Sequence, residues 1–143
     1  MQVQVAPEQR NWAMAAHLSA LVAVAGIPFG HVIGPLVVYL TKGQESQFVR
    51  EHARASLNYQ ISISIFAILA VIVAAAATLG FVVPMTSSSD STAASFNLAA
   101  LWIAFAVAAL LVVLASILFI ILGTIAAGEG RPYTYPFAIR FIR

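Results

Sequence analysis

Polar and charged side chains gather in one short stretch of an otherwise apolar chain. Residues 50–62 read REHARASLNYQIS, whereas charged residues make up only 8% of the 143 residues. At the four-residue spacing of a helix, the side chains from position 52 to position 64 form two neighbouring polar stripes. Amides and hydroxyls without partners are costly to bury in lipid, so these stripes are expected to face other helices, backbone carbonyls or water. The candidate polar cleft consists of His52, Ser56, Asn58, Gln60, Ser62 and Ser64.

Two kinds of chemistry fit these neutral side chains. Hydrogen bonding between helices is the simpler interpretation, and each such bond contributes only about 0.6 to 2 kcal/mol. A permeation path is the alternative, but the stripes offer no carboxylate within the membrane that would couple transport to protons or ions. The cleft is therefore predicted to join helices.

The sequence carries no recognisable catalytic or cofactor set. It has no phosphate loop and no combination of nucleophile, base and orienting group, and the absence of cysteine removes thiolate chemistry and cysteine metal sites. His17, His31 and His52 lack the local spacing of metal ligands, although two histidines can meet across a bundle to hold a metal or haem. We expect a non-enzymatic protein without a cofactor.

The composition places these residues in a membrane. Hydrophobic residues make up 62% of the chain, and uncharged windows cover residues 11–41, 55–89 and 91–128. Each window exceeds the roughly 20 residues that a helix needs to cross a bilayer. We predict an all-α integral membrane protein that forms one transmembrane domain over residues 1–143. Its membrane segments are expected at about 11–26, 31–41, 56–83 and 97–127, followed by a tail at 128–143.

Proline and glycine interrupt the first window. An internal proline removes a helical hydrogen bond and clashes with the preceding turn, so residues 11–41 are expected to form two short pieces. The pieces make a re-entrant hairpin or two short crossings, and one kinked crossing is the remaining alternative. A tight turn explains the break more simply than an anion site at the start of the second piece. The candidate helix break comprises Pro28, Gly30, His31, Gly34 and Pro35.

Basic residues set the orientation of the second and third windows. The link between them carries Asp90 and no lysine or arginine, whereas basic residues flank both outer ends. By the positive-inside rule the link lies outside and both flanks are cytoplasmic, as in a multi-pass protein of the cell inner membrane with both termini cytoplasmic. The tail is expected to lie on anionic lipid as a helical strip with Phe137 and Phe141 on one face. The expected cytoplasmic anchors are Lys42, Arg50, Arg54, Arg131, Arg140 and Arg143.

The expected partners are the lipid bilayer and membrane proteins. Ala100, Ala104 and Ala108 recur at every fourth position, and such small faces let helices approach closely within a hairpin or between protomers of a homo-oligomer. The net charge of +2 is too small to indicate nucleic-acid binding.

Four segments together resemble a known family. RNWAMAAHLSAL, GPLVVYL, FVREHARASLNYQIS and GEGRPYTYP, in this order, resemble a widespread bacterial family of small membrane proteins of unknown function. That family is related to the twenty-kilodalton Tic subunit of the plastid inner-envelope import machinery. The resemblance implies four membrane segments with both ends cytoplasmic, and it implies little about activity.

Two functional classes remain at this point. The first is an accessory or structural subunit of a membrane assembly, which we favour because the polar stripes are neutral. The second is a small oligomeric channel or transporter-like conduit, by analogy with the components of protein-import channels.

Overall fold

The computed structural model describes residues 5–26, 28–85 and 91–143 of the chain. These residues are helical apart from short connections and the tail, and none of them forms a strand. The chain divides into two compact units. Unit 1 comprises residues 1–64 and 116–143, and unit 2 comprises residues 65–115. Asp90 and the polar link before it lie outside the described residues.

Unit 1 begins with helix α1 (Pro7–Leu18), which continues as the 3-10 helix η1 (Ser19–Ala25). Pro7 occupies the first helical position, where its missing N–H is not needed. The Ala6 N–H donates to Gln9 Oε1 at 3.3 Å, so a side chain one turn into the helix satisfies the backbone at the helix start. Glu8 in the first turn adds a favourable charge at the positive end of the helix dipole.

The helix break is narrower than the sequence predicts. Gly26 and Phe29 have positive φ angles of 85° and 57°, and α2 (Gly30–Leu40) starts directly after them. Of the five residues expected in the break, only Pro28 precedes α2; the helix includes Gly30 and His31 in its first turn and runs through Gly34 and Pro35. Gly34 instead permits close packing, because a Cβ added there would lie 2.6 Å from the Ser19 carbonyl oxygen.

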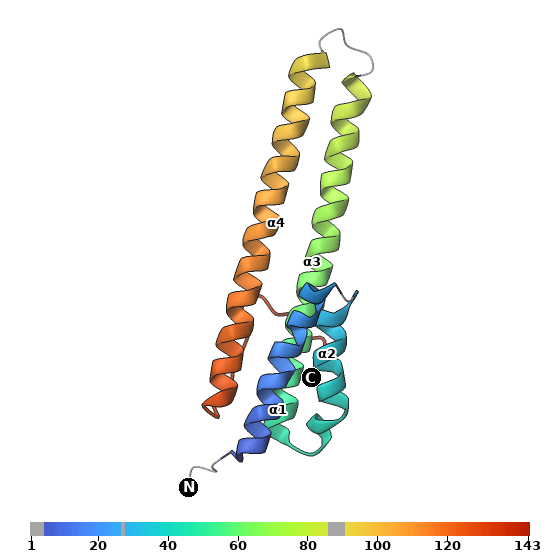
Figure 1. The fold of residues 1–143 in the computed structure, drawn as a ribbon. Helices are drawn as coiled ribbons and strands as arrows, with labels where there is room; N and C mark the ends of the chain where they lie inside the picture. Colours follow the sequence, from blue (N-terminus) through green and yellow to red (C-terminus); the bar gives the residue numbers. More distant parts are fainter. Residues whose placement is uncertain (1–4, 27, 86–90) are drawn as a thin grey trace. The chain divides into compact units, whose positions relative to one another are not determined.

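Helix α2 packs against both α1 and η1, and a short 3-10 helix η2 (Lys42–Gln44) follows it. The chain therefore reverses direction after η1 and does not continue as one kinked helix (Figure 1). At ~1.5 Å per residue, α2 is only about 16 Å long, well short of a ~30 Å hydrocarbon layer. The first window thus forms a compact pair of short helices.

Small side chains make the interior of unit 1. Ala13, Ala16 and Ala53 are completely buried, and Ala16 and Ala53 belong to one cluster with Val38 and Val49. Alanine at a helix contact lets the two backbones approach closely. The residues that follow Ala16 and precede Ala53 are His17 and His52, so this close approach brings two imidazoles together.

The two long helices are α3 (Gln47–Met85) and α4 (Ser91–Gly128), each of which contributes to both units. The stretches Gln47–Gly80 and Ser95–Gly128 are long and apolar enough to cross a membrane. They contain the expected segments 56–83 and 97–127 except for the last three residues of the former. Large apolar side chains of unit 2, such as Ile68 and Leu110, are exposed, which suits helices surrounded by lipid.

The tail is not the helical strip that the spacing of Phe137 and Phe141 predicts. Residues 129–143 contain no helix, and both Gly130 and Phe137 have positive φ angles, of 74° and 60°. Two prolines within this segment also disfavour a helix. The tail backbone instead bonds to side chains of α3, as described below.

Candidate functional site

Three buried side chains of unit 1 form a continuous chain of hydrogen bonds. His17 of α1 is completely buried, His52 of α3 is 2% exposed, and Tyr135 of the tail is 7% exposed. His17 Nδ1 lies 2.8 Å from the Tyr135 hydroxyl, and His17 Nε2 lies 2.8 Å from His52 Nδ1. His52 Nε2 lies 3.1 Å from the backbone carbonyl of Arg131. The chain therefore joins α1, α3 and the segment that follows α4.

The carbonyl at one end determines the direction of every bond. A carbonyl only accepts, so His52 must carry its proton on Nε2, and neutral His52 then accepts at Nδ1. His17 must therefore donate from Nε2, and neutral His17 accepts at Nδ1 from the Tyr135 hydroxyl. Both histidines are neutral in this arrangement, and an added proton would place two donors face to face.

The facing nitrogens of the two histidines are hydrogen-bonded to each other and do not have the spacing of two ligands on one metal ion. Two nitrogens on one zinc ion, each at about 2.0 Å in tetrahedral geometry, lie about 3.3 Å apart. His17 and His52 are closer than that and share a proton. Within the described ranges, no three histidine, aspartate or glutamate side chains gather as metal ligands. The third histidine, His31, instead donates to Ser64 Oγ at 2.9 Å, because the Ser64 proton goes to the Gln60 carbonyl.

Helix α4 accommodates the imidazole of His17 through a glycine. A Cβ added to Gly123 would lie 3.0 Å from His17 Nδ1 and 3.1 Å from the Tyr133 ring. Both neighbours are parts of packed rings, so neither can move aside freely. Gly123 thus provides the space in which the hydrogen-bond chain forms.

Aromatic rings surround the Tyr135 end of the chain. The Tyr135 ring stacks on Tyr59 with centroids 4.4 Å apart and planes at 15°, and the Tyr59 hydroxyl shares a hydrogen bond of 2.9 Å with Ser116 Oγ on α4. Burial raises the pKa of the Tyr135 phenol above its usual range, and the nearby Ser56 hydroxyl offsets part of this rise. The phenol therefore stays protonated and keeps its role as donor to His17.

A second group of polar residues on α3 binds the tail. Asn58 Oδ1 accepts from the N–H groups of Phe141 and Ile142 at 3.1 and 2.9 Å, and Asn58 Nδ2 donates to the Ile142 carbonyl at 3.0 Å. Ser62 Oγ accepts from the Ile139 N–H at 2.8 Å and donates to the Asn58 carbonyl. We call these contacts the tail clamp. The Asn58 amide thus makes three hydrogen bonds to the tail backbone, as a neighbouring strand would.

Four of the six residues of the candidate polar cleft fall into three environments. His52 belongs to the hydrogen-bond chain, Asn58 and Ser62 form the tail clamp, and Ser64 bonds to His31. Gln60 Nε2 and Ser56 Oγ are buried and meet no hydrogen-bond geometry among the described residues, although Ser56 lies near enough to affect the Tyr135 phenol.

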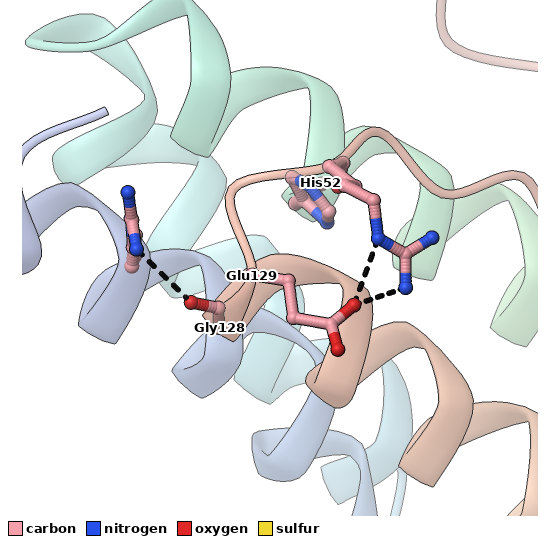
Figure 2. Close-up of polar contacts among 5 residues, drawn as sticks. His52, Gly128 and Glu129 are labelled. Atoms are coloured by element: carbon pink, nitrogen blue, oxygen red, sulfur yellow. Dashed lines mark hydrogen bonds and ion pairs between the residues drawn. The ribbon is translucent and has the colours of Figure 1, made fainter. Parts of the chain in front are cut away.

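The basic residues expected as anchors also fall into two sets. Arg50 Nε donates to the Gly43 carbonyl at 2.7 Å, Lys42 pairs with Glu45, and Arg131 pairs with Glu129. Figure 2 shows the Glu129 carboxylate and the Gly128 carbonyl at the end of α4, the latter 3.5 Å from an Arg10 guanidinium nitrogen. The other set, Arg54, Arg140 and Arg143, lines a cavity.

The fold and the buried network define a helical membrane protein in which two long apolar helices accompany a polar, basic unit. The chain matches the model of the magnetosome magnetite crystal formation protein family over residues 8–142, and it belongs to this family. The expected membership of a bacterial family of small membrane proteins is thereby supported, whereas the expected relationship with the plastid import subunit gains no support. No curated protein and no solved structure matches the chain.

Sequence reasoning alone does not find the hydrogen-bond chain. His17 and Tyr135 are 118 positions apart, and His17 and His52 are 35 apart, so no local spacing connects them. The segments that carry the family resemblance do contain all three residues. The resemblance indicates that these segments matter, but it gives no indication that the three residues meet.

Proposed function

We propose that the protein is a non-enzymatic accessory subunit of a membrane assembly that takes part in the formation of magnetite crystals. The observation that carries this proposal is the family match over residues 8–142. Accessory proteins act by binding other components. The buried polar groups of unit 1 are mostly hydrogen-bonded to one another, which fixes the conformation of the unit before a partner binds. A pre-organised unit binds partners without a large ordering cost.

The proposed topology follows from the distribution of charge. All seven lysine and arginine residues lie in unit 1, and unit 2 has none. The positive-inside rule then favours a cytoplasmic unit 1 surface and a pair of crossings by α3 and α4. The short pair α1–η1 and α2 returns the chain to the same side, which favours a re-entrant hairpin or two short crossings with both termini cytoplasmic.

A complementation experiment tests the proposed role. The chain, fused to a fluorescent protein, is expressed in a magnetosome-forming bacterium that lacks its own member of the family. We expect the fusion to reach the magnetosome membrane and to restore the size distribution of magnetite crystals seen by electron microscopy. Correct membrane insertion without any change in the crystals would overturn the role in magnetite formation.

A matched variant separates the fold from the function in the same host. Gly123→Leu is expected to abolish the rescue, because it fills the space of the His17 imidazole. Gly80→Leu places a side chain where a Cβ meets nothing within 4 Å, and it is expected to rescue as the wild type does. Equal rescue by both variants would contradict a need for the folded unit 1.

A further inference from the structure

A cavity of about 720 Å³ lies in unit 1 between the start of α3 and the tail. Its charged lining consists of Glu51 and three arginines, namely Arg54 on α3 and Arg140 and Arg143 on the tail. Its walls also include Asn58 and Tyr133. The cavity is therefore strongly basic on an otherwise sparsely charged protein.

The three arginines of the cavity differ from the other arginines of the chain. Arg10, Arg50 and Arg131 each hydrogen-bond to a carbonyl or a carboxylate. Arg54, Arg140 and Arg143 have no hydrogen bond or ion pair with any described residue of the chain. The neighbouring Glu51 carboxylate accepts instead from Gln47 Nε2 at 2.9 Å. Three guanidinium groups thus remain available at one cavity.

The tail clamp holds two of these arginines in place. The N–H groups of Ile139, Phe141 and Ile142 are bonded to Ser62 and Asn58, so the backbone on both sides of Arg140, and just before Arg143, is fixed. Asn58 lies one helical turn after Arg54, on the same face of α3. Three like charges repel one another, and a fold that fixes them around one cavity fits an anionic ligand.

The chemistry of the lining selects the class of anion. The guanidinium group is a planar fork of donors that binds phosphate oxygens in pairs, so several guanidiniums around one cavity suit a phosphate group. The tail that carries Arg140 and Arg143 also exposes two phenylalanines: Phe137 is 81% exposed and Phe141 is 47% exposed. Phosphate chemistry next to exposed apolar groups at a membrane edge fits a phospholipid.

We infer that this cavity binds the phosphate headgroup of an anionic phospholipid, with Arg54, Arg140 and Arg143 as the binding residues and Asn58 as the residue that positions the tail. The acyl chains lie against the exposed phenylalanines of the tail. This inference does not depend on a role in magnetite formation, because it is tested on the purified full chain.

The experiment measures the thermal unfolding midpoint of the detergent-solubilised chain against added short-chain phosphatidic acid. Phosphatidylcholine with the same chains is the control for the acyl part, and inorganic phosphate at matched ionic strength is the control for free phosphate. We expect saturable stabilisation by phosphatidic acid and much weaker effects of the other two. Stabilisation by inorganic phosphate equal to that by phosphatidic acid would overturn the lipid as the occupant, and so would equal stabilisation by phosphatidylcholine.

Charge-matched variants test the site itself. R140Q/R143Q is expected to weaken phosphatidic acid binding by about tenfold or more, because charge-assisted bonds are lost. K42Q/R131Q removes the same charge from two exposed ion pairs and is expected to change binding by less than about threefold. Equal losses in the two variants would mean that net charge alone attracts the lipid, and would overturn the site.

The positioning role of Asn58 has its own readout. Asn58→Leu keeps all three arginines but frees the tail, so lipid binding is expected to fall while a cysteine placed at Ile142 becomes more reactive. Ser62→Ala is the milder variant should Asn58→Leu not fold, and Asn97→Leu, at an exposed position of unit 2, is the control. Wild-type lipid affinity in a variant with a reactive, released tail would overturn the positioning role.

Discussion

At the residue scale, the main feature of the molecule is a hydrogen-bond chain in which each proton has one position. The Arg131 carbonyl determines the tautomers of His52 and His17, and Tyr135 supplies the last proton. Such a chain specifies one arrangement of α1, α3 and the tail, because a shift of any partner leaves a buried donor or acceptor without a partner. The hydrogen-bond chain thus contributes more to the choice of one packing arrangement than to the free energy of unfolding.

The energetic coupling between His17 and His52 is measurable by a double-mutant cycle. His17→Phe and His52→Phe are each expected to destabilise unit 1, and the double variant is expected to fall short of the sum by about 0.6 to 1.7 kcal/mol. Thermal unfolding in detergent gives the change in stability for each single variant and for the double variant. The matched cycle pairs His52 with His31, which bonds to Ser64 instead, and should be additive. Additive behaviour of the first cycle would contradict the hydrogen bond between His17 and His52.

The Tyr135 phenol makes the stability of unit 1 depend on pH in the alkaline range. Because burial raises its pKa in the folded state, the unfolded state loses the proton first, near pH 10. Stability is then fully present below about pH 10 and falls as pH rises above it, by up to about 1.4 kcal/mol per pH unit for one proton. Tyr135→Phe is expected to lose part of this slope in unfolding curves between pH 8 and pH 11. An unchanged slope would contradict the buried phenol.

At the element scale, glycine decides how closely the helices approach. Gly123 of α4 faces the rings of His17 and Tyr133, whereas Gly80 of α3 faces open space. The two positions are alike in sequence, since each is a single glycine within a long apolar helix. Only the packed structure distinguishes them.

This contrast predicts opposite effects of the same substitution. Gly123→Ala is expected to destabilise unit 1 by about 1 to 3 kcal/mol, because the new methyl group overpacks two rings. Gly80→Ala is expected to be neutral, or to stabilise α3 by up to about 1 kcal/mol through helix propensity. Thermal unfolding of both variants is the measurement. Equal effects would show that Gly123 does not pack against the His17 imidazole.

The sequence predicts the long helices well and the tail poorly, for identifiable reasons. Apolar length alone predicts α3 and α4, because only a helix satisfies its own backbone in lipid. The clamp on Ile139, Phe141 and Ile142 depends on side chains of α3 about 80 positions away, which no local pattern reveals. For the same reason Asn58 is recognisable in the sequence as a polar residue in need of a partner, but the tail is not recognisable as that partner.

At the scale of the whole molecule, the basic residues are confined to unit 1, whereas exposed apolar side chains occur in both units. The lysines and arginines lie in unit 1, and the exposed apolar side chains of unit 2 have no basic residue among them. Composition predicts this division, since the uncharged windows are visible in the sequence. Which residues of unit 1 face one another, however, follows only from the packing of the short helices against α3.

Single-cysteine labelling tests the proposed topology, and the chain contains no native cysteine. A membrane-impermeant thiol reagent applied to intact cells is expected to label Ser88→Cys, in the link outside the described residues. It should leave Gln44→Cys unlabelled until the cells are opened, because Gln44 lies between basic residues on the proposed cytoplasmic side. Labelling of Gln44→Cys in intact cells would refute the orientation.

The tail clamp also has a consequence for the order in which the protein is made. Asn58 and its partner Ile142 are 84 positions apart, so at usual rates of synthesis roughly 4 to 17 s separate their emergence from the ribosome. During that interval the Asn58 amide must be met by water or by lipid headgroups at the membrane edge. Closure of unit 1 must therefore wait for the tail, which follows both long helices in the chain, and the slowest folding step is expected to be the docking of this tail.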